Sequence, residues 1–326
     1  MEPYYYQKMN KPQQAAYHAM QQGVLALADE IQLPRIPAEE LYDVFFRLRL
    51  DYPEIFWVVS YRYKYYQDSP NIIFVPEYLF EKNKIREHQK AMQSRVEKLA
   101  RPAAKFTEWE KEKYIHDFIC ENITYDKLKK PYSHEIIGPL GHGVGVCEGI
   151  AKTFLYLCDQ EQIPAALVVG SADGSELGVN DDMLHAWNLV SLEGSWFHID
   201  PTFDLCQSQA VKANRYDYFC LSDEEMMRDH IFEKKVECVS NEKSYFCQTK
   251  CLIKNSSELR TYIQKRFAAG KRVFYFKIVA DLRKMDKALD KAMMITQGTL
   301  TNIGWVYPYR YYYNKSQGII YINLMK

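Results

Sequence analysis

A helix that begins at a cysteine constrains this chain more than any other feature. Residues 141–160 read GHGVGVCEGIAKTFLYLCDQ. Apolar side chains recur at helical steps, which predicts one buried helix face; they are Cys147, Ile150, Ala151, Phe154, Leu155 and Cys158. Cys147 stands in the first turn, where free N–H groups and the helix dipole favour a thiolate and can bind an oxyanion. Gly145, just before it, lets a substrate backbone approach closely. Taken alone, the motif also fits a buried apolar cysteine.

A hairpin downstream favours the catalytic interpretation. His185–Val190 and Trp196–Ile199 alternate in the manner of strands, and Glu193-Gly194 between them predicts a two-residue turn. With that turn, His185 lies diagonal to Asp200 on one face of the sheet. Diagonal partners are about 7–8 Å apart at Cα, within reach of a His–carboxylate hydrogen bond. We therefore expect Asp200 to orient His185, and His185 to take the proton of the Cys147 thiol.

Three motifs together resemble the transglutaminase-like superfamily, of the bacterial peptidase-like type. They are Gly-Val-Cys147-Glu-Gly-Ile-Ala, His185-Ala-Trp-Asn and Trp196-Phe-His-Ile-Asp200-Pro-Thr-Phe-Asp. The resemblance covers about residues 105–205. It implies that Cys147 is the nucleophile, His185 the base and Asp200 the orienting acid. It also implies a papain-like α+β core in which the cysteine helix packs against an antiparallel sheet. Members of this superfamily include crosslinking transglutaminases, peptidases, deglycosylating amidases and inactive proteins, so the reaction stays open.

Other polar and aromatic residues near these motifs are weaker candidates. Tyr125, His142 and Asn188 are candidates for the second oxyanion donor, and His142 alternatively lines the cleft as a loop histidine. Trp187 shares the hairpin face with His185 and is expected to wall the substrate pocket. His198 fits a packed strand histidine better than a catalytic one.

The loop 170–182 carries several acids just before His185. Asp173, Glu176, Asp181 and Asp182 could form a rim that selects basic substrates or binds Ca2+. Their spacing fits no EF-hand loop, so a solvated loop is the better interpretation.

Charge and composition exclude some classes of protein. Lys+Arg and Asp+Glu both number 42, and this zero net charge argues against a nucleic-acid-binding or strongly membrane-binding protein. None of the 8 cysteines forms a CxxC pair with metal-site spacing, and Cys247-x3-Cys251 stands alone as a weak signal, so we expect no metal and no cofactor. No apolar run is long enough for a membrane span, and no signal peptide is evident. The chain reads as cytoplasmic, although a trimmed signal peptide would leave a secreted or cell-surface protein open.

We expect three parts: an N-terminal accessory α+β unit (1–100), the catalytic core (101–235) and a C-terminal accessory α+β unit (236–326).

Two tyrosine-rich segments near the ends of the chain resemble each other. The first is Tyr61-Arg-Tyr63 with a following strand at 71–75, and the second is Tyr309-Arg-Tyr311 with a following strand at 318–322. This predicts a helix–strand–strand unit repeated on both flanks, whose edges could pair into one sheet. Chance similarity of tyrosine-rich strands is the alternative.

The favoured reaction is cysteine-dependent acyl transfer on amide bonds of a protein or peptide substrate, through a thioester. Hydrolysis is favoured because water is always an available acceptor. Protein–glutamine crosslinking and a non-catalytic binding or scaffold protein are the alternatives. The sequence does not give the oligomeric state.

Overall fold

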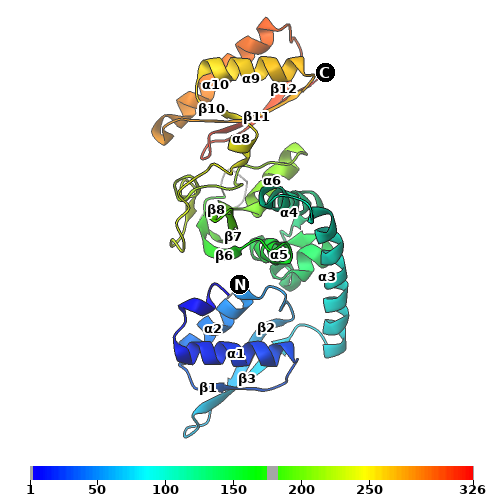
Figure 1. Cartoon of the computed structure of the whole chain (residues 1–326), viewed down its shortest axis with the longest axis vertical. Coiled ribbons are helices and arrows are strands. Elements are labelled where there is room, and N and C mark those ends of the chain that lie inside the picture. The colour runs from blue at the N-terminus through cyan, green and yellow to red at the C-terminus, as the bar shows by residue number, and fades with distance from the viewer. Residues whose placement is uncertain (1–2, 175–182, 326) are drawn as a thin grey trace. The chain divides into compact units, whose positions relative to one another are not determined.

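A computed structural model describes residues 3–174 and 183–325 of the chain, which forms a mixed α+β fold (Figure 1). The chain divides into two compact units. The first comprises Met1–Val169, His185–Gly194 and Asp200–Asn214, and the second Gly170–Leu184, Ser195–Ile199 and Arg215–Lys326. Residues 1–100 thus fall in the same unit as Cys147, and the three-part division stays a prediction.

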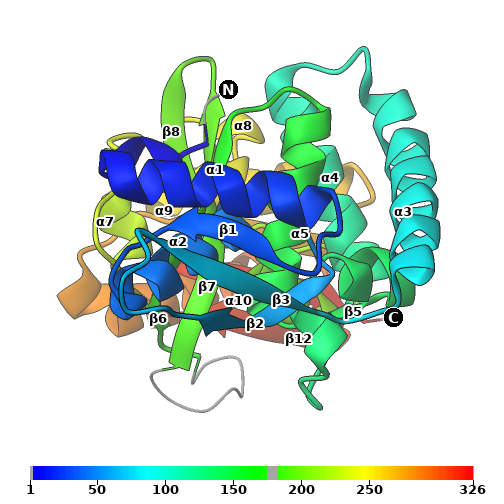
Figure 2. The same ribbon diagram turned by 90° about the horizontal axis from the view of Figure 1, so that it is seen from below.

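The N-terminal part is an α–β–α–β–β run. Its elements are α1 (Lys11–Leu25), β1 (Ile31–Pro34), α2 (Ala38–Asp51), β2 (Val58–Lys64) and β3 (Asn71–Tyr78), after a short 3-10 turn, η1 (Tyr6–Lys8). The strands form an antiparallel sheet in the order β1-β3-β2. Helix α1 begins at a capping box between Asn10 and Gln13, and it contacts β1 and α2 (Figure 2). Phe45 of α2 packs on Phe74 of the central strand, with ring centroids 5.7 Å apart.

The C-terminal part repeats this topology. Its elements are β10 (Leu252–Ile253), α9 (Ser256–Ala268), β11 (Val273–Ile278), η5 (Leu282–Lys284), α10 (Met285–Asn302), β12 (Tyr309–Asn314) and β13 (Ile319–Leu324). The sheet order is β10-β11-β13-β12, so β11-β13-β12 corresponds to β1-β3-β2. The predicted helix–strand–strand unit is therefore present at both ends, and the repeat extends to a preceding helix and strand.

Strand register relates the two copies with an offset of one residue from the sequence parallel, because it matches Phe74 with Ile322 and not with Tyr321. In the first copy Phe74 pairs with Tyr63 on one side and Ile31 on the other. In the second copy Ile322 pairs with Tyr311 and Phe274 in the same way. The expected pairing of the two hairpins into one sheet is wrong for the described residues, since each hairpin belongs to its own sheet. A third strand, β1 or β11, already pairs with the second strand of each hairpin.

The middle of the chain carries the cysteine helix. Its elements are α3 (Lys82–Ala103), α4 (Glu108–Asn122), β4 (Thr124–Tyr125), η2 (Pro131–His134), η3 (Gly138–His142), β5 (Val144–Gly145), α5 (Cys147–Gln160), β6 (Ala165–Ala172), β7 (Met183–Leu192), β8 (Ser195–Ile199), α6 (Pro201–Val211), α7 (Asp223–Met226), β9 (His230–Ile231) and α8 (Tyr245–Gln248). The larger sheet has the order β8-β7-β6-β9, and the short β4 and β5 form a parallel pair. Ala151 of α5, Leu167 of β6 and Ala186 of β7 share one buried cluster. The cysteine helix thus packs on the sheet, as expected for an α+β core.

Three local features adjoin the catalytic motifs. Residues 201–204 begin helix α6. Residues 216–221 form no regular strand, and Leu221 makes an isolated bridge to His198. Helix α3 continues through Arg101-Pro102, across the predicted boundary between residues 100 and 101.

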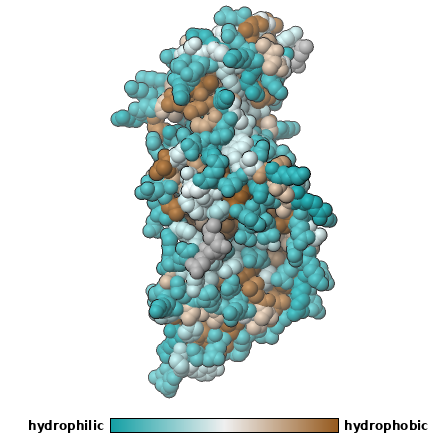
Figure 3. Space-filling view, in the orientation of Figure 1, coloured by the Kyte–Doolittle hydropathy of each residue, from teal (hydrophilic) through white to brown (hydrophobic). Residues whose placement is uncertain are grey.

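Two surface properties complete the description. Among the described residues, the helices are too short or too polar to cross a membrane. On the face drawn in Figure 3, hydrophobic residues form small patches separated by hydrophilic ones.

Candidate active site

Close backbone packing fixes the first turn of α5. The N–H of Val146, the N-cap residue, donates to the carbonyl of Ser133 at 3.0 Å. A Cβ on Gly149 would lie 2.2 Å from the same carbonyl oxygen, so only glycine allows this approach. Val146 has no polar side chain to cap the helix, and Cys147 is half-buried at the N-terminus. The first-turn N–H groups therefore lie beside an accessible sulfur atom.

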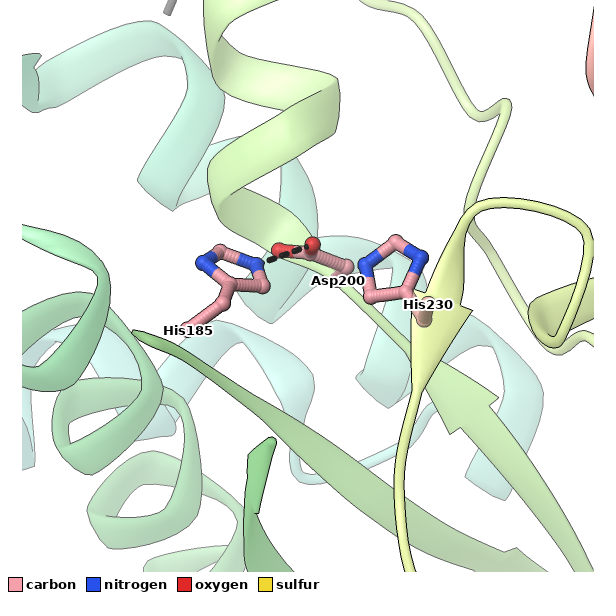
Figure 4. A group of neighbouring side chains, drawn as sticks. All are labelled: His185, Asp200 and His230. Carbon is pink, nitrogen blue, oxygen red and sulfur yellow. Dashed lines mark hydrogen bonds and ion pairs between the residues drawn. The ribbon is translucent and has the colours of Figure 1, made fainter. Parts of the chain in front are cut away.

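The hairpin has the predicted two-residue turn. Glu193 and Gly194 have φ values of +51° and +82°, the left-handed pair that a tight hairpin turn requires. The turn brings His185 to Asp200, with 2.6 Å between Nε2 and Oδ2. Figure 4 shows the ring edge directed at the carboxylate and the second nitrogen pointing away from it.

The Asp200 carboxylate is held from a second direction. Asp200 is fully buried and is the N-cap residue of α6. Its Oδ1 accepts hydrogen bonds from the backbone N–H groups of Thr202 at 2.9 Å and Phe203 at 3.2 Å. Because a helix N-terminus stabilises a carboxylate, this arrangement fixes both the charge and the direction of Asp200.

The surroundings of His185 favour its charged form. Burial opposes protonation, but the charge and hydrogen bond of Asp200, together with a hydrogen bond to Cys147, raise the pKa of His185 to about 10. The imidazole ring lies between Trp187 and Phe203, with centroids 5.8 and 4.8 Å away. The structure therefore brings Cys147, His185 and Asp200 into one site.

Tyr125 lies at the same site. It pairs with Gly145 across the short β4–β5 ladder, two residues before Cys147. Burial raises the pKa of Tyr125, and the nearby Cys147, Cys206 and Asp200 raise it further. The phenol hydroxyl is thus protonated at neutral pH and can donate a hydrogen bond.

The match to a family model agrees with this geometry. Residues 93–201 match the model of the transglutaminase-like superfamily. This segment is a transglutaminase-like domain. No curated protein sequence matches the chain at a significant level.

Solved structures with similar regions are distant. One is described as "a TGase"; it is 14% identical, covers 44% of each chain and has a TM-score of 0.31. A "Putative Cysteine Protease" from Cytophaga hutchinsonii is 14% identical over 44% of this chain and 62% of that chain, with a TM-score of 0.30. A "putative protease" from Parabacteroides distasonis is 12% identical over 43% of this chain and 35% of that chain, with a TM-score of 0.26. The chain thus spans less than two thirds of each of these proteins.

Three predicted residues of the transglutaminase-like domain have other surroundings than expected. Trp187 is fully buried and stacks on His185, so it supports the imidazole and does not wall an open pocket. Asn188 is also fully buried, and its amide donates to the Ala151 carbonyl at 3.0 Å, which ties β7 to α5. His142 is exposed and packs on Tyr132, with ring centroids 4.6 Å apart.

Sequence reasoning missed two residues near the site, both on α6 just beyond the matched segment. Phe203 packs against the imidazole, and Cys206 lies close enough to Asp200 and Cys147 for their charges to act on it. Burial, followed by the Asp200 charge, raises the pKa of Cys206 to about 12. Asp200 followed by proline is a helix-start signal, and a helix beginning there would have indicated both residues.

One other group of ligand-type side chains lies in the second compact unit. His198, Asp223 and Cys238 are buried with their potential ligand atoms within 4.8 Å of one another. His198 Nε2 is 2.9 Å from Asp223 Oδ1, and Lys234 Nζ is 3.2 Å from Oδ2. These contacts already satisfy the carboxylate, so we assign no metal to the group. His198 is a packed strand histidine, as predicted.

The acidic loop before His185 is only partly described. Glu176, Asp181 and Asp182 lie outside the described residues. The backbone N–H of Asp173 donates to the Asp229 carbonyl at 2.8 Å.

Proposed function

We propose that this protein is a cysteine hydrolase that cleaves amide bonds of a protein or peptide through a thioester. One observation supports the proposal above all. The half-buried Cys147, at a helix N-terminus, interacts with His185 and contributes to its raised pKa, and the imidazole Nε2 of His185 is held by a buried Asp200. This is the arrangement of a nucleophile, a base and an orienting acid.

In the proposed acylation step, the thiol proton already resides on the charged His185, and the Cys147 sulfur attacks the carbonyl carbon of the substrate amide. The oxyanion that forms accepts hydrogen bonds from the Cys147 N–H and from a second donor, for which we propose the Tyr125 hydroxyl. The C–N bond then breaks, and His185 gives its proton to the leaving amine. Cys147 is left as a thioester.

In the proposed deacylation step, His185 removes a proton from water, and the hydroxide attacks the thioester carbonyl. The C–S bond breaks, the thiolate regains its proton from His185, and a carboxylic acid leaves. If an amine took the place of water, the same steps would make a crosslink. The half-buried sulfur permits either acceptor, and we propose water.

The acceptor can be tested directly. The enzyme is incubated with a peptide library and a fluorescent primary amine, and products are identified by mass spectrometry. Cleaved peptides without incorporated amine are expected, and both products should be absent with Cys147→Ala. Cys247→Ala is the matched control, because Cys247 is also half-buried but lies in the other compact unit. Amine incorporation as the main product would favour crosslinking instead.

Thiol labelling separates an enzyme from a scaffold. At mildly acidic pH, iodoacetamide should label Cys147 much faster than Cys247. Both lie in the first turn of a helix, but Cys147 has the His185 imidazole beside it. Equal labelling of the two thiols would contradict the proposal.

A further inference from the structure

Four charged side chains of the first compact unit form a closed group beside Cys147. Lys152 of α5 is fully buried, and its Nζ lies 2.9 Å from Glu135 Oε2 and 2.7 Å from Glu148 Oε1. Arg49 of α2 forms an ion pair with Glu135, which is 2% exposed, and lies 3.8 Å from Glu148. Two cations and two anions therefore balance. Removing one leaves a largely buried, unmatched charge.

The balance of charge in this group bears on the nucleophile through Glu148. It follows Cys147 directly and occupies the same first helical turn. Burial disfavours its ionisation, but Lys152, His134 and Arg49 lower the pKa of Glu148 well below its usual range. A charged carboxylate thus belongs to the same helical turn as the nucleophile. A negative charge there disfavours a thiolate unless cations offset it.

Arg49 reaches this group from the N-terminal α–β–α–β–β run. The end of α2 is anchored nearby, since Asp51 accepts a hydrogen bond from the Tyr5 N–H at 3.0 Å. The Tyr5 hydroxyl in turn donates to the Leu167 carbonyl of β6 at 2.8 Å. Arg49 is therefore held in place in two ways. Its helix, α2, is anchored at its end, and its guanidinium faces the carboxylates of Glu135 and Glu148.

We propose that Arg49 is a positioning residue for the proposed reaction. Through Glu135 and Glu148 it holds the first turn of α5 and offsets the negative charge next to Cys147. The accessory run at the N-terminus thereby sets how readily the nucleophile ionises. This inference rests on the proposed role of Cys147, and the experiment below separates the two.

The test compares Arg49→Met with Arg47→Met. Arg47 lies on the same helix but pairs with Asp43 at 2.9 Å, outside the group. The rate of iodoacetamide alkylation is measured at Cys147 by peptide mass spectrometry over a range of pH, together with kcat and KM. For Arg49→Met, the midpoint of the alkylation profile should rise by roughly one pH unit. We expect kcat to fall about tenfold with little change in KM, and Arg47→Met to match the wild type.

Two further variants distinguish charge from packing. Arg49→Lys keeps the charge and should keep the wild-type midpoint. The double variant Arg49→Met/Glu135→Gln removes one charge of each sign, so its midpoint should return toward the wild type. It also avoids leaving Glu135 buried and unmatched if the single variant folds poorly.

The outcomes separate the two proposals. An unshifted profile in a folded Arg49→Met protein would reduce Arg49 to a structural role. If that variant does not fold, a midpoint that is shifted by about one pH unit in the double variant or in Arg49→Lys would do the same, because both variants keep the balance of charge. Slow alkylation of Cys147 in the wild-type protein would instead overturn the proposed nucleophile itself.

Discussion

The first compact unit contains two groups made of the same three residue types. Cys147, His185 and Asp200 form the candidate active site, and Cys120, His116 and Asp204 form a second group between α4 and α6. In the second group, His116 Nε2 is 3.0 Å from Asp204 Oδ2 and 3.7 Å from Cys120 Sγ.

Access and helix position distinguish the two groups. Cys147 is half-buried in the first turn of its helix, whereas Cys120 is buried near the end of α4. Burial raises the pKa of the Cys120 thiol, despite the neighbouring His116. A substrate cannot reach it. The comparison teaches that residue types at bonding distance do not make a nucleophile. A position at the N-terminus of a helix and an open side do.

The largest effect on peptide turnover is expected when alanine variants of the two cysteines are compared. Cys147→Ala should abolish peptide turnover while the protein stays folded. Cys120→Ala should keep wild-type turnover per folded molecule and lower the free energy of unfolding by about 1–3 kcal/mol, because it leaves a small cavity. Peptide assays and thermal denaturation of both variants check this. Loss of turnover in a folded Cys120→Ala protein would break the comparison.

Asp200→Asn should lower kcat/KM by about 100-fold, because an amide stabilises the imidazolium less well than a carboxylate. The Asp200 charge helps to raise the pKa of His185 to about 10. Without it that pKa falls, so the alkaline limb of the pH–rate profile should move to lower pH. An alkaline limb at its wild-type position would show that His185 is not the group that titrates.

Asp204→Asn should lower the free energy of unfolding and leave the catalytic rate of the folded protein unchanged. It removes the nearer of the two carboxylates that face the buried His116, while Asp117 stays at 3.5 Å from Nδ1, and the cost should be at most about 3–5 kcal/mol. Burial opposes protonation of His116, but Cys120, Asp117 and Asp204 raise its pKa. The stabilisation is therefore complete below pH about 6.5 and is lost as pH rises through the folded pKa. Urea denaturation should show the largest difference from wild type at the acidic end, with the pH–rate profile of folded protein unchanged.

The smallest effect on stability is expected for His198 in the second unit. The pKa of His198 is lowered, whereas that of His116 is raised. Burial lowers the pKa of His198 to about 4, although Asp223 opposes this. The unfolded chain therefore binds more protons between pH 4 and 6.5, and stability falls as pH falls through that window. His198→Gln should flatten this dependence by at most about 1.4 kcal/mol per pH unit. Denaturation at pH 4, 5 and 6.5 measures it, and an unchanged slope would contradict the shift.

The sequence predicted well the contacts between residues that lie close together along the chain. The apolar stripe of α5 and the Glu193-Gly194 turn were enough to predict that His185 and Asp200 meet, since they lie on one hairpin. The Tyr61-Arg-Tyr63 pattern predicted the repeated hairpins. In each case the partners are close in sequence, so helix or strand geometry alone relates them.

Contacts between distant segments could not be predicted in this way. His116 and Asp204 are 88 positions apart, and Arg49 and Glu135 are 86 apart. Periodicity gives the buried face of each helix but not the helix that covers it. The pairing of the two hairpins into one sheet failed for a related reason. The four-residue strand Ile31–Pro34 is too short to recognise from sequence, yet it completes the first of the two sheets.

The two oxygens of Asp200 serve different neighbours, one the imidazole and the other the start of α6. Any redistribution of charge at the ring must therefore be felt by the amide protons of Thr202 and Phe203. Nuclear magnetic resonance of these two protons would follow the ionisation of the site without a substrate, an inhibitor or a label.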